Sequence, residues 1–88
     1  MKLRSFIVDD DVASRNMLAQ IIQDEELGVV IGEAESGIGA MPLILNLSPD
    51  IVLIDLLMPE IDGIETVERL RNEGFTGQFI MISQVESK

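Results

Sequence analysis

Hydrophobic positions along the chain follow two different spacings, and their alternation predicts seven secondary-structure elements. Short continuous apolar runs are typical of strands covered on both faces, and apolar residues three and four positions apart are typical of amphipathic helices. The predicted strands are residues 3–8, 29–34, 51–56 and 79–82, and the predicted helices are residues 13–26, 38–47 and 64–73. Strands that alternate with helices in this way predict a parallel sheet with right-handed crossovers.

Local signals refine the helix boundaries. Asp62 precedes the third helix as a predicted N-cap, and Gly74 follows it as a predicted stop. Pro42 belongs in a first helical turn, so the second helix is expected to start late or to kink. The apolar faces are predicted to comprise Met17, Leu18, Ile21 and Ile22 in the first helix, and Met41, Ile44 and Leu45 in the second.

The order of the elements predicts one α/β domain of 88 residues with a doubly wound, flavodoxin-like parallel sheet. Four strands are expected in the order 2-1-3-4, with three helices. Ligands of such sheets bind at the carboxyl ends of the strands, where the strand order reverses. The first and third strands flank that point.

Composition excludes several kinds of function. The chain is 47% hydrophobic but only 3% aromatic, which predicts an aliphatic core, and it has neither Cys nor His. Disulfides, thiolate metal sites and histidine catalysis are therefore excluded for this chain. The net charge is -10, so direct binding to nucleic acid is not expected and a hard cation is a more natural partner. No signal peptide or bilayer-spanning run is evident, so we expect a cytoplasmic protein that does not bind membranes.

Acidic residues follow the first strand and end the third: Asp9, Asp10 and Asp55. Two such charges about 4 Å apart repel by roughly 4 kcal/mol at an effective dielectric constant near 20, and no basic residue adjoins them in sequence. A divalent cation would relieve this repulsion, and oxygen-only ligands favour Mg²⁺, Mn²⁺ or Ca²⁺ over zinc. Asp9 and Asp10 alone would also suit a solvated loop, and Asp11 is best interpreted as a helix N-cap.

Three stretches, "FIVDDD", "IVLIDLLMPEIDG" and "FIMIS", resemble the receiver domain of bacterial response regulators, and the resemblance extends over the whole chain. It implies that Asp55 accepts a phosphoryl group from a phosphohistidine of a sensor histidine kinase and thereby switches partner interactions, as in transcription regulation. It also implies that Asp10 and Asp55 bind Mg²⁺ (or Mn²⁺) directly, with the Leu57 backbone carbonyl, and that Asp9 binds mostly through water. Ser83 would be the switch hydroxyl that bonds the phosphoryl group.

The sequence departs from the receiver pattern after the fourth strand. Receivers continue with a fourth helix, a fifth strand carrying a Lys that pairs with the phosphoryl group, and a fifth helix. This chain ends in "SQVESK", and Lys88 follows Ser83 too closely to be that Lys. We therefore expect a C-terminally truncated receiver whose fourth strand has a bare edge, through which copies associate. Gln84 replaces the usual small residue after the switch hydroxyl, and the apolar Leu57 implies slow phosphate loss.

Two other interpretations remain open at this stage. A Mg²⁺-dependent phosphohydrolase with an Asp nucleophile typically carries a second Asp two positions later, as a general acid. That position is Leu57, so the chain is not expected to be an enzyme. The second interpretation is an interaction module that is never phosphorylated. The acidic residues and Ser83 argue against it for the parent protein, whereas the missing Lys argues for it in this chain.

Overall fold

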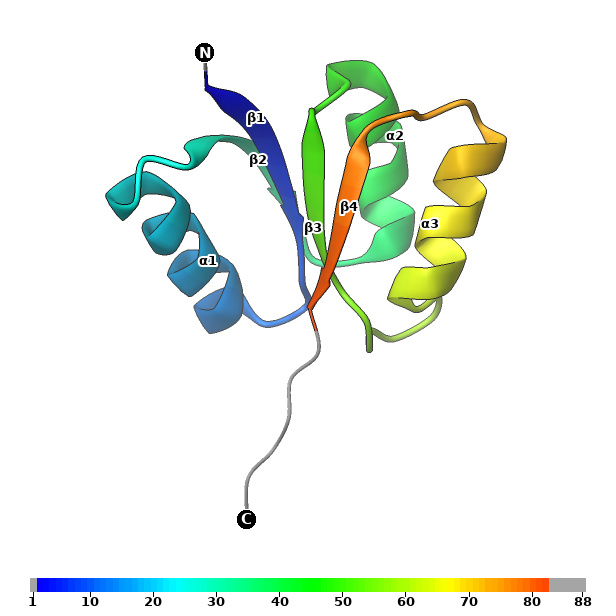
Figure 1. Ribbon diagram of the computed structural model, residues 1–88. Helices are drawn as coiled ribbons and strands as arrows, with labels where there is room; N and C mark the ends of the chain where they lie inside the picture. Colours follow the sequence, from blue (N-terminus) through cyan, green and yellow to red (C-terminus); the bar gives the residue numbers. More distant parts are fainter. Residues whose placement is uncertain (1, 83–88) are drawn as a thin grey trace.

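A computed structural model describes residues 2–82 and confirms the predicted fold class. The strands form a four-stranded parallel sheet in the order β2-β1-β3-β4 (Figure 1). Along the chain, the elements are β1 (Leu3–Val8), α1 (Val12–Asp24), β2 (Gly28–Ala34), α2 (Gly37–Leu47), β3 (Ile51–Asp55), α3 (Gly63–Asn72) and β4 (Gln78–Ile82). Every predicted element is present, and its bounds differ from the predicted ones by at most two residues.

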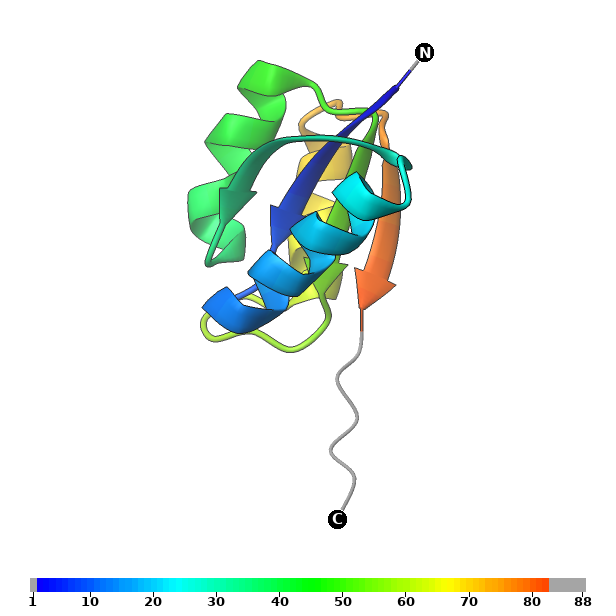
Figure 2. The same ribbon diagram turned by 90° about the vertical axis from the view of Figure 1, so that its left-hand side faces the viewer.

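The helices lie on both faces of the sheet. Figure 1 shows α1 on one side of the strands and both α2 and α3 on the other, and Figure 2 shows α1 crossing in front of the sheet. The hydrophobic core lies between the sheet and the α2–α3 layer. Its buried residues are Phe6, Val8, Ala40, Ile44, Val52, Ile54, Leu70 and Phe75. Within residues 2–82, no helix has the length and apolar character needed to cross a bilayer.

Helix α1 buries a narrower face than its sequence predicts. Ile22 and Ser14 are buried, whereas Met17 and Ile21 are 58% and 46% exposed. The prediction that all four apolar residues face the core is therefore wrong for two of them. Among the described residues, the main packing of α1 is against β2 and β1, at one side of the sheet, which leaves part of its apolar face exposed.

Helix α2 also differs from its prediction. It begins at Gly37, capped by the Ser36 side chain, and continues through Pro42, so the late start, one of the two expected alternatives, is wrong. Pro42 deprives the Ile38 carbonyl of its helical donor, but both residues lie on the exposed side, where water can replace that donor. Leu45, predicted to face the core, is 38% exposed.

The predicted ends of α3 are confirmed. Asp62 is the N-cap, and its side chain accepts a hydrogen bond of 2.8 Å from the Glu65 amide. After the helix, Gly74 has φ of +92°, a left-handed conformation that favours glycine and turns the chain toward β4.

Strand β4 is an edge of the sheet within the described residues. It pairs with β3 on one side only. Ile80 and Met81 are 48% and 43% exposed, so the apolar run is not covered on both faces here. This exposure agrees with the bare edge expected from the sequence.

Candidate functional site

The carboxyl ends of β1 and β3 bring the three predicted acids together. The two strands pair in parallel, with Val8 opposite Ile54, so Asp9 and Asp55 emerge at the same end of the sheet. One carboxylate oxygen from each of Asp9, Asp10 and Asp55 lies within 4.8 Å of the others. Asp9 and Asp55 are buried, whereas Asp10 is exposed. The convergence predicted from the sequence is therefore present in the structure.

Asp9 is the most deeply buried of these acids, with 1% of its surface exposed. Its Oδ1 accepts a hydrogen bond of 2.9 Å from the Asp11 amide. Its Oδ2 is buried and has no hydrogen-bond partner among the described residues. An unpaired buried carboxylate oxygen is costly, and a cation would offset that cost. The oxygen-only ligands and the unpaired oxygen both fit a hard divalent cation such as Mg²⁺.

Asp55 is 5% exposed and ends β3. Burial raises the pKa of its carboxyl group, and the negative charges of Asp9 and Asp10 raise it further. The Leu57 amide, which donates to Asp55 Oδ1 at 3.1 Å, opposes this rise in pKa. The ionised carboxylate is therefore held at the sheet rim in an environment that disfavours its charge.

This raised pKa predicts how stability depends on pH in metal-free protein. Because the folded pKa of Asp55 exceeds the ordinary value of 3.8, the native state binds more protons between those two values. The contribution of Asp55 to stability therefore falls as pH rises through that window. Asp55→Asn should melt at the wild-type temperature near about pH 4 and progressively above it as pH rises through that window. Circular dichroism melts in EDTA test this, and a pH-independent difference in Tm would contradict it.

Asp11 has a different role, as predicted. Its side chain caps α1, accepting hydrogen bonds from the Ala13 amide at 3.3 Å and the Ser14 hydroxyl at 2.9 Å. The Ser14 hydroxyl, followed by the Ala13 amide, lowers the pKa of the Asp11 carboxyl. Asp11 is thus a capping residue and is not one of the three clustered carboxylates.

A glycine allows the start of α3 to lie against the phosphoacceptor candidate. The Gly63 amide donates to the Leu56 carbonyl at 3.0 Å. A Cβ at Gly63 would lie 2.6 Å from the Asp55 carbonyl oxygen, which is too close for any other residue. The loop of residues 56–62 therefore turns back sharply onto the end of β3.

The remaining predicted site residues lie beside Asp55 or outside the described residues. The Leu57 side chain is 68% exposed, and its amide bonds Asp55 as described above. Ser83, Gln84 and Lys88 lie outside residues 2–82. The last residue of β4, Ile82, pairs with Asp55, and its carbonyl accepts from the Leu56 amide at 2.9 Å.

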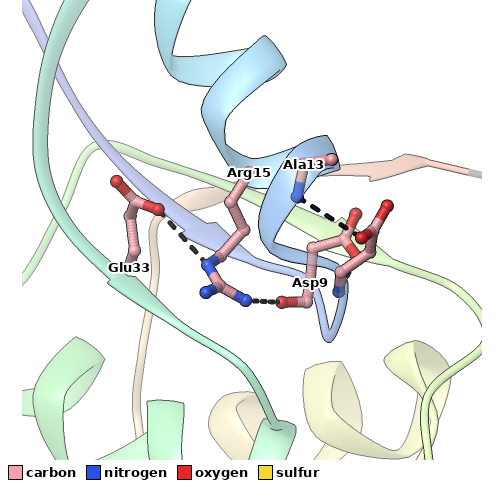
Figure 3. Close-up of polar contacts among 5 residues, drawn as sticks. Asp9, Ala13, Arg15 and Glu33 are labelled. Atoms are coloured by element: carbon pink, nitrogen blue, oxygen red, sulfur yellow. Dashed lines mark hydrogen bonds and ion pairs between the residues drawn. The ribbon is translucent and has the colours of Figure 1, made fainter.

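Sequence reasoning missed a basic residue at this site. Arg15 Nη1 donates a hydrogen bond of 2.6 Å to the backbone carbonyl of Asp9, and Arg15 Nε lies 3.3 Å from Glu33 Oε1 (Figure 3). No basic residue adjoins the acids in sequence, but the fold supplies one from the first turns of α1. The available signal was the position of Arg15 four residues after the N-cap, which directs it back toward the loop that precedes the helix.

A parallel α/β sheet with an acidic cluster at the point of strand reversal defines a doubly wound domain with a candidate cation site. The sequence matches the family described as "Response regulator receiver domain" over residues 6–88. The chain belongs to this family.

Individual relatives agree with this assignment. Transcriptional regulatory protein GlnL of Bacillus subtilis is 51% identical over 87 residues, which are 98% of this chain and 27% of that protein. A protein-glutamate methylesterase/protein-glutamine glutaminase of Trichodesmium erythraeum is 37% identical over 99% of this chain and 25% of its own length. The chain thus spans about a quarter of the length of these two curated relatives.

A solved structure supports the fold. A chain in the crystal structure of the CheX–CheY–BeF3–Mg²⁺ complex from Borrelia burgdorferi matches with a TM-score of 0.86 and 32% identity. The match covers 94% of this chain and 63% of that chain.

Proposed function

We propose that this receiver domain accepts a phosphoryl group on Asp55 from a phosphohistidine of a sensor histidine kinase, with Mg²⁺ bound at the acidic cluster. The convergence of three carboxylates carries the proposal, together with the buried Asp9 Oδ2, which has no hydrogen-bond partner within residues 2–82. Membership of the receiver family supports it, since a domain of this kind serves as a signalling module.

The three clustered carboxylates offer oxygen ligands for such a cation. We assign direct metal contacts to Asp10 and Asp55, a backbone carbonyl contact to Leu57, and a contact mostly through water to Asp9. Mg²⁺ commonly uses one or two carboxylates and keeps several waters, which suits one exposed and two buried acids. Mn²⁺ can use the same ligands. When bound, Mg²⁺ would shield Asp55 from the incoming negative charge and stabilise the transferring oxygens.

Asp55 is the nucleophile in this proposal. Its Oδ1 is engaged by the Leu57 amide, so we assign the attack on phosphorus to Oδ2. A P–O bond forms as the P–N bond of the phosphohistidine breaks, and the departing imidazole retains its ring proton. Burial holds the carboxylate in one place before the donor arrives.

The acyl phosphate would change which partners the domain binds. The phosphoryl group adds a charge of about -1.5 to -2 and three acceptor oxygens. We assign Ser83 as the hydroxyl that bonds it, and the pairing of Ile82 with Asp55 supports this choice, because Ser83 directly follows Ile82. The CheX–CheY complex shows that a chain similar to this one associates with another protein.

Incubation with acetyl phosphate and Mg²⁺, followed by intact mass measurement, tests the proposal. The wild-type chain should gain the mass of one phosphoryl group, and Asp55→Asn should gain none. Asp62→Asn is the matched control, because it removes a nearby acid and keeps a residue suited to capping α3.

Other outcomes would overturn the proposal. An unmodified wild-type chain would indicate an interaction module that is not phosphorylated. Rapid consumption of acetyl phosphate without an adduct would indicate a phosphohydrolase, although the residue two positions after Asp55 is Leu57 rather than the acid such an enzyme requires. We therefore propose that the chain has no hydrolase activity of its own.

A further inference from the structure

Arg15 is held in a defined position at the rim of the acidic cluster. Its side chain is 16% exposed, and its guanidinium group has a partner on each of two sides (Figure 3). One nitrogen, Nη1, donates to the Asp9 carbonyl, and another, Nε, pairs with the Glu33 carboxylate on β2. A planar guanidinium can satisfy both partners at once, which a lysine ammonium on its flexible stem does poorly.

These contacts clamp the backbone of Asp9 from two sides. The Asp9 amide donates to the Ala34 carbonyl at 3.1 Å, and the Asp9 carbonyl accepts from Arg15 at 2.6 Å. Ala34 and Glu33 are neighbours at the end of β2. The backbone amide of Asp9 is therefore tied to that strand directly, and its backbone carbonyl is tied to it through Arg15. Among residues 2–82, the Asp9 carboxylate itself accepts a hydrogen bond only from the Asp11 amide, so the direction of the carboxylate depends mainly on the backbone.

The ion pair between Arg15 and Glu33 keeps the guanidinium group against the Asp9 backbone carbonyl and away from the clustered carboxylates. A positive side chain this close could neutralise the acids and compete with a divalent cation. Instead, Arg15 bonds the Asp9 carbonyl and Glu33, and Asp9 Oδ2 has no hydrogen-bond partner in the part of the chain that the structure describes. Glu33 therefore serves to hold the guanidinium away from the position where a cation would bind.

We propose that Arg15, held by Glu33, is a positioning residue that fixes Asp9 for divalent cation binding. The proposal rests on the function proposed above and extends it to two residues that do not themselves contact the cation. It resembles the way in which partners beyond the direct ligands orient a metal site, whose loss commonly weakens metal affinity by about 10–100-fold.

Titration of the 88-residue chain with MgCl₂, followed by NMR through the Asp11 and Leu57 amides, tests this proposal. Arg15→Lys keeps the charge and Arg15→Gln removes it, and both should weaken Mg²⁺ binding by about tenfold. Arg69→Lys and Arg69→Gln are the matched controls, because Arg69 pairs with Glu65 on the exposed surface of α3. These controls should bind Mg²⁺ as the wild-type chain does.

The two Arg15 variants separate positioning from simple charge. If Arg15 acted only through its charge, Arg15→Gln would bind Mg²⁺ more tightly and Arg15→Lys would match the wild type. Either result overturns the proposal. Glu33→Gln retains an acceptor oxygen but weakens the hold on Arg15, so it should reduce affinity in the same direction by a smaller factor.

A metal-independent measurement distinguishes this proposal from the one on which it rests. In EDTA, the Asp11 amide reports its bond to Asp9 Oδ1, so its hydrogen exchange should accelerate in Arg15→Lys and not in Arg69→Lys. A wild-type chain that fails to bind Mg²⁺ would defeat the proposed function. Unchanged exchange of the Asp11 amide in Arg15→Lys would defeat the positioning role, whatever the metal does.

Discussion

Saturating Mg²⁺ is expected to raise the melting temperature of the wild-type chain, and Asp10→Asn is expected to abolish most of that rise. A ligand at roughly 100 times its dissociation constant stabilises the native state by about 2.7 kcal/mol. In a domain of this size, each kcal/mol shifts Tm by about 4–8 °C. The predicted rise is therefore well above the error of a thermal melt followed by circular dichroism.

In EDTA, by contrast, Asp10→Asn should not lower the melting temperature. Asp10 contributes an oxygen to the cluster, and its charge is one cause of the raised pKa of the buried Asp55 carboxyl. Without a cation, replacing Asp10 by Asn relieves repulsion at little cost, because Asp10 is exposed. The metal-free variant should thus melt at or above the wild-type temperature.

Asp11→Asn is the matched control for the Asp10→Asn measurements with Mg²⁺ and in EDTA. It removes the same charge from the adjacent position, and Asn can keep the capping role of Asp11 at the start of α1. The variant should retain the Mg²⁺-induced rise in Tm. A wild-type Tm that ignores Mg²⁺, together with a destabilised Asp10→Asn in EDTA, would show that the cluster is not a metal site.

The 88-residue chain is also expected to self-associate through β4. Within residues 2–82, the outer edge of this strand presents backbone donors and acceptors without a partner strand, and residues Gln78–Ile82 carry no charge to oppose pairing. Ile80 is half exposed beside Leu53, and both point to the α1 side of the sheet, because their neighbours Val52, Ile54 and Phe79 face the α2–α3 core. Burying one such side chain contributes about 1.5–3 kcal/mol. The net charge of -10 opposes association, but over only about 8 Å at physiological salt.

Light scattering coupled to size exclusion, at tens of micromolar, tests this prediction. Ile80→Lys should shift the chain toward the monomer, because each 1.4 kcal/mol lost weakens association about tenfold. Ile64→Lys is the control, since Ile64 is similarly exposed, at 51%, but lies on α3 rather than on β4. A wild-type chain that runs as a monodisperse monomer and remains so on warming would contradict the prediction.

The sequence by itself determined the elements, their order and the position of the acidic site. The spacing of apolar residues indicates whether a segment is a helix with one apolar stripe or a strand with two buried faces. This spacing can be read from neighbouring residues alone. The start of β3 at Ile51 and the N-cap at Asp62 could therefore be predicted almost to the residue. The proximity of Asp9 and Asp55 could also be predicted from the sequence, because the carboxyl ends of adjacent parallel strands lie at one edge of the sheet.

Only the tertiary structure decided which apolar residues are buried and how the acids are supported. Met17 and Ile22 have the same apolar character in sequence, but Ile22 is 5% exposed and Met17 is 58% exposed, so packing alone distinguishes them. Glu33 reaches Arg15 because the pairing of β2 with β1 brings distant segments side by side. The missing partner of Asp9 Oδ2 likewise depends on every group around it, and periodicity along a chain carries no information about such three-dimensional surroundings.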